Sequence, residues 1–175
     1  SEPDTPPSLS CMAWGGDMNP TETWRSGFVR RWHSNPDLAS TAQTNAHHQW
    51  GCAVLAMHLF PEDHDLLRAA ILHDVAEVNL GDVSGLAKRQ TPALKAALDE
   101  AEAHNAARLG IEYTASECLK FVDMLDAYLW AKHHRPDILD GQGWPDQLRK
   151  MTALATALGV SDKFRAIIEE RTKHG

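Results

Sequence analysis

The sequence predicts an all-α protein with a single helical domain, and three observations support this. No segment of the 175 residues keeps the period-two alternation of apolar and polar residues that a half-buried strand requires. Several apolar segments instead have the length of a helix, with Ser, Thr or Asn before them and Pro or Gly after them. The chain is also long enough for one well-packed domain and too short for two.

The first part of the chain predicts an irregular arm followed by three helices. Residues 1–20 are rich in Pro, Ser, Gly and Asp and form the arm, and the helical domain covers residues 21–175. Asn19 or Thr21 caps the first helix, and Pro36 breaks the segment after it because proline disfavours helix at the preceding residue. The third helix is apolar almost all round, which marks it as central. The three helices are predicted at residues 21–32, 44–60 and 62–78.

The second part predicts four more helices after a loop that contains Gly81 and Gly85. The first has Pro92 in its first turn and stops at Gly110. The next begins at a Ser116 cap and ends before a proline. The four helices are predicted at residues 91–110, 116–134, 145–158 and 161–173.

Composition narrows the class of protein. The formal net charge of −7 argues against broad binding of nucleic-acid polymers, which needs a basic face. Cys11, Cys52 and Cys118 are widely spaced, so we expect free thiols in a reducing compartment. The sequence shows neither a signal peptide nor an apolar stretch of about 18 residues. We therefore expect a cytoplasmic protein that does not engage a membrane.

The segment ILHDVAEVNLGDV, residues 71–83, places polar groups in an apolar helix. Adjacent imidazole and carboxylate groups are costly there unless something binds them. His73 and Glu77 lie four residues apart, and Asp74 and Glu77 three, so all of them can edge one helix face. Imidazole and carboxylate ligands suit a divalent cation such as Zn²⁺, Mn²⁺, Co²⁺ or Fe²⁺. The neighbouring helices offer further candidates, namely His47, His48, Asp123 and Asp126.

Three segments in this order resemble the HD-domain phosphohydrolases: AHHQWGCAVLA, LLRAAILHDVAEVNLGDVSGLAKR and LKFVDMLDAYLWA. The upstream FVRRWHSNP is similar to the 5′-deoxynucleotidase branch, which has an Arg-Trp pair before its first metal histidine. Compact phage deoxynucleoside triphosphate triphosphohydrolases, including those that hydrolyse dATP, share this form. The resemblance covers roughly residues 28–131. It implies an HD-type helical bundle that binds one divalent metal ion, with Zn²⁺, Co²⁺ or Mn²⁺ favoured over Mg²⁺.

The resemblance also implies roles for particular residues. His48 is preferred to His47 because the segment after it then matches the family's helix phase. Glu77 is implied to orient or deprotonate the attacking water, and Asp82 is implied to be a second acid near the scissile phosphate. The implied metal ligands are His48, His73, Asp74 and Asp123.

Substrate contacts follow from the same resemblance. Arg31 and Lys88 are implied to contact phosphate, and Trp32 is implied to form a wall that disfavours a ribose 2′-OH. His33 either touches substrate beside Trp32 or is a loop histidine. Asp126 is either a hydrogen-bonded or solvent-facing neighbour of Asp123 or a substrate residue.

The implied reaction is metal-dependent hydrolysis of the 5′-phosphate of a small deoxynucleotide. Deoxynucleoside monophosphates come first as substrates, giving deoxynucleoside and phosphate. The alternative is release of triphosphate from a deoxynucleoside triphosphate such as dATP, which needs more cations. Arg30, Arg89 and His47 are the candidates for these cations. The resemblance also implies a homo-oligomer.

Two other classes of protein stay open at this point. One is a catalytically inactive nucleotide-binding protein of the same fold, and the other is a structural bundle with internally paired His and Asp residues. The presence of all four ligand positions together with Glu77 and Asp82 argues against an inactive site.

Overall fold

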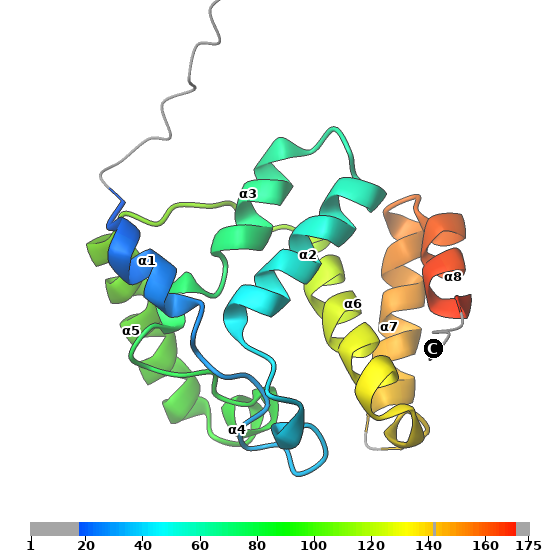
Figure 1. Cartoon of the computed structure of the whole chain (residues 1–175), viewed down its shortest axis with the longest axis horizontal. Coiled ribbons are helices and arrows are strands. Elements are labelled where there is room, and N and C mark those ends of the chain that lie inside the picture. Colours follow the sequence, from blue (N-terminus) through cyan, green and yellow to red (C-terminus); the bar gives the residue numbers. More distant parts are fainter. Residues whose placement is uncertain (1–17, 142, 171–175) are drawn as a thin grey trace, which may run out of the picture.

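The computed structural model describes residues 18–141 and 143–170, which form helices and turns and no strand (Figure 1). An isolated antiparallel bridge joins Arg30 and Thr44. Short 3₁₀ turns cover Ala39–Thr41, Val75–Glu77 and Pro136–Ile138. The α-helices are α1 (Pro20–Ser26), α2 (Asn45–Leu59), α3 (His64–Leu72), α4 (Gly85–Gln90), α5 (Pro92–Leu109), α6 (Glu117–His134), α7 (Trp144–Ala157) and α8 (Ser161–Glu169).

Helices α2 and α6 form the centre of the domain. Helix α2 packs against both α3 and α6, and α6 packs in turn against α7, with α8 beside α7 (Figure 1). Phe121, Leu125 and Met151 are among the largest fully buried side chains of this core. Burial of such side chains is the main favourable contribution to folding, so α2 and α6 are firmly held.

A second apolar cluster holds α5 against the end of α3. It contains Leu72, Val75 and Val78 from the chain that leaves α3, and Leu109 and Ile111 from the end of α5. The two valines can reach this cluster only if the chain leaves α3 in a tight turn. The cluster therefore fixes the direction of the chain just after His73 and Asp74.

Most of the predicted helices are confirmed, with ends that agree within one or two residues. Thr44 caps α2 by accepting a hydrogen bond from the His47 N–H, and Ser116 caps α6 in the same way. Helix α5 ends where Gly110 adopts φ +66°, a left-handed conformation that favours glycine. Helix α7 takes the place of the predicted segment 145–158.

The prediction of a helix over residues 21–32 is wrong beyond Ser26. After α1 the chain pairs with the segment before α2, since the Arg31 N–H donates to the Gln43 carbonyl and the Asn45 N–H donates to the Val29 carbonyl. These backbone groups are then not available for a helix. Trp32 consequently takes φ +61° in the middle of this segment.

The prediction of one helix over residues 62–78 is also wrong at both ends. Asp63 accepts a hydrogen bond from the Leu66 N–H and so starts α3 at His64. The helix ends at Leu72 and the chain continues as the 3₁₀ turn. His73 and Asp74 therefore stand at the exit of the helix and not within its apolar face.

Three further differences concern shorter segments. Part of the predicted loop after Gly81 forms α4, and α8 ends at Glu169, short of residue 173. Residues 1–17 and 171–175 lie outside the described residues, and with them almost all of the predicted arm. Pro20, its last residue, begins α1. None of the described helices has the length and apolar character of a membrane span.

Candidate metal centre and active site

Four predicted metal ligands meet at one point, brought there by α2, the end of α3, and α6. The Nε2 atom of His48 lies 3.2 Å from Nε2 of His73. It also lies 3.1 Å from Oδ1 of Asp123 and 3.5 Å from Oδ2 of Asp74. His73 Nε2 and Asp74 Oδ2 are likewise 3.5 Å apart. Two ligands about 2.1 Å from one ion lie about 3.0–3.4 Å apart at octahedral or tetrahedral angles, so this donor set fits a divalent metal.

The electrostatics of the cluster also favour a cation. His48 is fully buried, and burial alone would lower its pKa. Hydrogen bonds to the carboxylates of Asp123 and Asp126 outweigh burial and raise the pKa of His48 to about 12. Desolvation raises the pKa of Asp123, but the hydrogen bond to His48 and the nearby positive charges lower it to about 2. The site thus holds several carboxylates that stabilise positive charge at its centre.

Cys52 is close to this cluster but is poorly placed as a ligand. Its sulfur is within 4.8 Å of the ligand atoms of His48, His73 and Asp123. Its sulfur lies 3.8 Å from Nδ1 and 3.7 Å from Nε2 of His48. Because these distances are nearly equal, the sulfur lies midway between the two ring nitrogens and away from the direction in which Nε2 would bind a metal. Burial raises the pKa of the Cys52 thiol to about 11. A neutral buried thiol packs as a small apolar group, and Cys52 is a free cysteine, as the sequence predicted.

Glu77 lies beside the candidate metal centre in an unusual environment. Its side chain is buried, and its Oε2 accepts a hydrogen bond of 2.8 Å from the Asn45 amide. Burial, followed by the charge of Asp74, raises the pKa of Glu77 to about 8. Sequence reasoning missed Asn45, which is fully buried one turn before His48. A buried polar residue at the start of the ligand-bearing helix is the signal that could have found it.

Arg31 lies inside the cluster. Its Nη1 donates to Oδ2 of Asp74 at 2.8 Å, and its side chain is mostly buried. Desolvation alone would lower the pKa of Arg31. The charges of the four surrounding acids, Asp74, Asp123, Asp82 and Glu77, outweigh this effect and raise the pKa above its ordinary value. Its Nε is buried without a hydrogen-bond partner among the described residues.

Trp32 and Asp82 are brought together at the edge of the same site. The Trp32 backbone N–H donates to Oδ2 of Asp82 at 3.4 Å. The Arg31 guanidinium carbon lies 5.7 Å from the centre of the Trp32 ring, within the range of a cation–π contact. A helix through residue 32 would have turned the Trp32 side chain in another direction. The left-handed backbone of Trp32 therefore contributes to the position of its ring at the edge of the site.

Other predicted residues lie apart from this cluster. The ammonium of Lys88 is 3.5 Å from Oε1 of Glu102, where α4 packs on α5. His47 is exposed, and its ring packs against Trp130 at a centroid distance of 4.6 Å. The phosphate contact expected of Lys88 stays a prediction.

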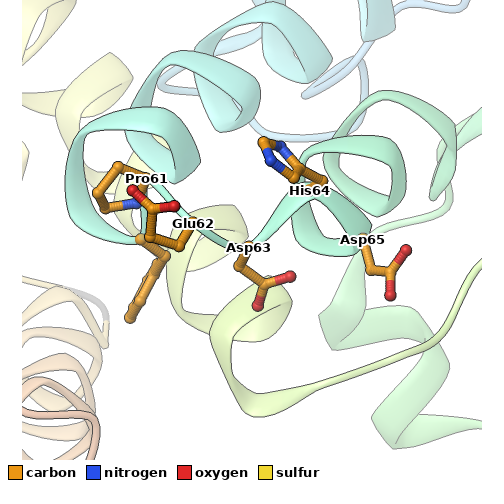
Figure 2. A pocket seen from close by; sticks show the side chains of 6 residues that line it. Pro61, Glu62, Asp63, His64 and Asp65 are labelled. Atoms are coloured by element: carbon orange, nitrogen blue, oxygen red, sulfur yellow. The ribbon is translucent and has the colours of Figure 1, made fainter.

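A hollow at the turn between α2 and α3 lies at the opposite end of α3 from the candidate metal centre (Figure 2). It is lined by six consecutive residues, 60–65, and Asp63 within it caps α3. The side chains labelled in Figure 2 come from the turn after α2 and from the first residues of α3, His64 and Asp65. Among the described residues, only this one segment lines the hollow, whereas the cluster around His48 brings together side chains from separate helices.

The fold and the cluster define an all-α protein with a candidate centre for a divalent cation. No protein-family model matches the chain, and no solved structure matches it. A dATP triphosphohydrolase of Salmonella phage PMBT28 is 33% identical over 174 residues, covering 87% of this chain and 79% of the relative. The chain belongs to the family of this phage enzyme, and so to the nucleotide hydrolases. Membership of the wider HD-domain superfamily stays a prediction.

Proposed function

We propose that this chain is a metal-dependent deoxynucleoside triphosphate triphosphohydrolase that converts dATP to deoxyadenosine and triphosphate. The observation that carries the proposal is the convergence of His48, His73, Asp74 and Asp123 in a relative of a dATP triphosphohydrolase. The sequence resemblance placed monophosphates first, but the name of the relative supports the triphosphate alternative better.

In this reaction water adds to the α-phosphorus and the bond from that phosphorus to O5′ of the deoxyribose breaks. O5′ is the leaving group and gains a proton to become the hydroxyl of deoxyadenosine, and the water oxygen stays on the released triphosphate. His48, His73, Asp74 and Asp123 would hold a divalent ion, which would supply positive charge next to the phosphate and lower the pKa of a water. Zn²⁺, Co²⁺ and Mn²⁺ suit the mixed imidazole and carboxylate donors, with Mg²⁺ as a further candidate.

The buried residues around the cluster supply the remaining parts. Glu77, held by Asn45, accepts the proton of the attacking water in its carboxylate form, which a cation held at the cluster would favour. The buried Oδ1 of Asn45 has no donor among the described residues, and it can accept a hydrogen bond from the same water. Asp82, whose carboxylate accepts a hydrogen bond from the Trp32 backbone N–H, is the second acid near the scissile phosphate.

Arg31 is the cation best placed for phosphate. Its Nη1 bonds Asp74, and its buried Nε keeps an N–H for a phosphate oxygen. Lys88 extends the positive charge along the triphosphate if it leaves Glu102 on substrate binding. Trp32 lines the sugar and leaves no room for a 2′-OH.

The products of the reaction test this proposal. Purified protein is incubated with dATP, dAMP or ATP and with Mn²⁺, Co²⁺, Zn²⁺ or Mg²⁺, and ion-exchange chromatography resolves triphosphate from orthophosphate. Deoxyadenosine and triphosphate from dATP are expected. If dAMP is hydrolysed to orthophosphate and dATP is not hydrolysed, the protein is a deoxynucleoside monophosphate hydrolase instead. If the protein binds metal but hydrolyses none of the nucleotides, it is a nucleotide-binding protein.

The sugar preference provides a second test. Trp32→Ala is expected to raise kcat/KM for ATP relative to dATP by about tenfold or more, because the wall against the 2′-OH is removed. An unchanged preference would show that Trp32 does not read the sugar.

A further inference from the structure

A continuous chain of hydrogen bonds runs behind the candidate metal centre and ends at Trp32. Nδ1 of His48 lies 2.6 Å from Oδ2 of Asp126, on the side of the ring away from the metal ligands. The same carboxylate oxygen accepts a hydrogen bond of 3.1 Å from Nε2 of Gln43. Oε1 of Gln43 accepts the indole N–H of Trp32 at 2.6 Å. Four side chains from separate parts of the sequence are thus joined.

The hydrogen-bond directions within this chain are determined by the groups at its two ends. The indole N–H of Trp32 can only donate, so it fixes the Gln43 oxygen towards Trp32 and the Gln43 amide N–H₂ towards Asp126. The Asp126 carboxylate then accepts from Nδ1–H of His48. When a metal displaces the other ring proton of His48, the lone pair is therefore on Nε2, where the other ligands converge.

The middle of this hydrogen-bond chain is buried. Gln43 is 1% exposed and Asp126 is 8% exposed, so each needs its partners inside the protein. The backbone of α2 adds a steric requirement, because a Cβ at Gly51 would lie 2.0 Å from Oδ1 of Asp126. A side chain at position 51 would therefore displace Asp126 from His48.

Trp32 is also held by its other contacts. Its left-handed backbone, at φ +61°, is sparsely populated for a non-glycine residue and must be supported by the surroundings. The ring packs on Trp144 of α7 at a centroid distance of 6.3 Å. The Gln43 hydrogen bond fixes the remaining freedom of the indole, its rotation about the side-chain bonds.

We propose that Asp126 and Gln43 are positioning residues that hold the metal ligand His48 and the sugar wall Trp32 in one arrangement. Asp126 sets the tautomer and the ring orientation of His48, and Gln43 ties Trp32 to the same carboxylate. Gln43 then determines sugar specificity without touching the substrate. The part that concerns Trp32 rests on the proposed function, whereas the part that concerns metal binding does not.

Metal affinity tests the role of Asp126. Isothermal titration of chelator-treated protein with Mn²⁺ or Co²⁺ is expected to show affinity about 10- to 100-fold lower for Asp126→Ala. Asp126→Asn, whose oxygen still accepts the His48 N–H, is expected to recover part of the loss. Gly51→Ala is expected to lose affinity as well, because it displaces Asp126. Unchanged affinity in folded Asp126→Ala would overturn this part.

Gln43→Met tests the link to Trp32, with Gln49→Met as the matched control. Gln49 is also a buried glutamine beside this site and takes no part in the chain of hydrogen bonds. We expect Gln43→Met to keep metal affinity within about threefold and to move the Trp32 indole N–H resonance, which Trp32→Phe assigns. The kcat/KM ratio of dATP over ATP is expected to fall about tenfold. The control is expected to change none of these.

The readouts separate failure of this inference from failure of the proposed function. If Trp32→Ala lowers the preference for dATP but Gln43→Met does not, the coupling through Gln43 is wrong. An indole resonance that Gln43→Met leaves in place would also contradict it. If the wild type binds metal but does not hydrolyse dATP, the proposed function fails while the metal and resonance measurements still decide the positioning roles.

Discussion

The same dipeptide, His-Asp, stands at both ends of α3, and only one copy belongs to a candidate site. His64 and Asp65 begin the helix and are exposed to solvent. His73 and Asp74 follow the end of the helix, where His48 from α2 and Asp123 from α6 meet them. The contrast shows that a His-Asp pair acquires chemistry from the elements that converge on it, not from its own sequence.

Asp74→Asn is expected to have the largest effect, because it removes both a charged ligand and the partner of Arg31. Metal affinity should fall by about 100-fold or more, and turnover of dATP should fall with it. Titration with Mn²⁺ and the product assay measure the two quantities. Asp65→Asn, in the exposed dipeptide, is the matched control and should change neither. A similar loss in both variants would erase the distinction between the two ends of α3.

Glu77→Gln separates catalysis from metal binding. We expect turnover to fall by about 10²–10⁴-fold, the usual contribution of a positioned base, with metal affinity nearly unchanged. Glu62→Gln alters an exposed acid of the hollow at the other end of α3 and should leave turnover unchanged. Normal turnover in Glu77→Gln would remove Glu77 from the mechanism.

The raised pKa of Glu77 predicts how pH affects the metal-free protein. Between pH 4.5, the ordinary value, and about 8, the unfolded chain releases a proton that folded Glu77 retains. The Glu77 contribution to stability is therefore full below pH 4.5 and is lost as pH rises to about 8. Denaturation by urea in the presence of a chelator, across this pH range, should show a shallower decline for Glu77→Gln than for wild type. Parallel curves would contradict the assignment.

Lys88→Ala is expected to have the smallest effect. Arg31 lies within the cluster, whereas Lys88 pairs with Glu102 on the neighbouring helix. Lys88 reaches the triphosphate only after it leaves Glu102, so its removal should weaken substrate binding only slightly. We expect KM for dATP to rise by about three- to tenfold with kcat retained. A fall in kcat as large as that of the Asp74 variant would place Lys88 at the reacting phosphate instead.

Local sequence signals predicted most of the fold. The predicted cap at Ser116 and the predicted stop at Gly110 located the start of α6 and the end of α5, because each acts on the backbone within one turn. The helices predicted at residues 21–32 and 62–78 extend too far because contacts between distant segments end them earlier. Residues after Ser26 pair with the chain before α2, and Val75 and Val78 turn away from α3 to reach α5.

The candidate site was predicted in its composition but not in its connections. The four candidate ligands and Glu77 carry the residue types that the proposed chemistry needs, so the resemblance could select them as candidates. Gln43 and Asn45 are ordinary polar residues in the sequence, and only burial beside Asp126 and Glu77 gives them a role. Such roles depend on tertiary contacts that no local pattern records.

The position of bound metal in the protein decides between the two ends of α3. Crystals of the full chain grown with Mn²⁺ would show the ion by its anomalous scattering. We predict a principal peak bounded by His48, His73, Asp74 and Asp123, and none beside His64 and Asp65. A principal peak at the turn between α2 and α3, or an empty cluster in protein that binds Mn²⁺ in solution, would contradict the account.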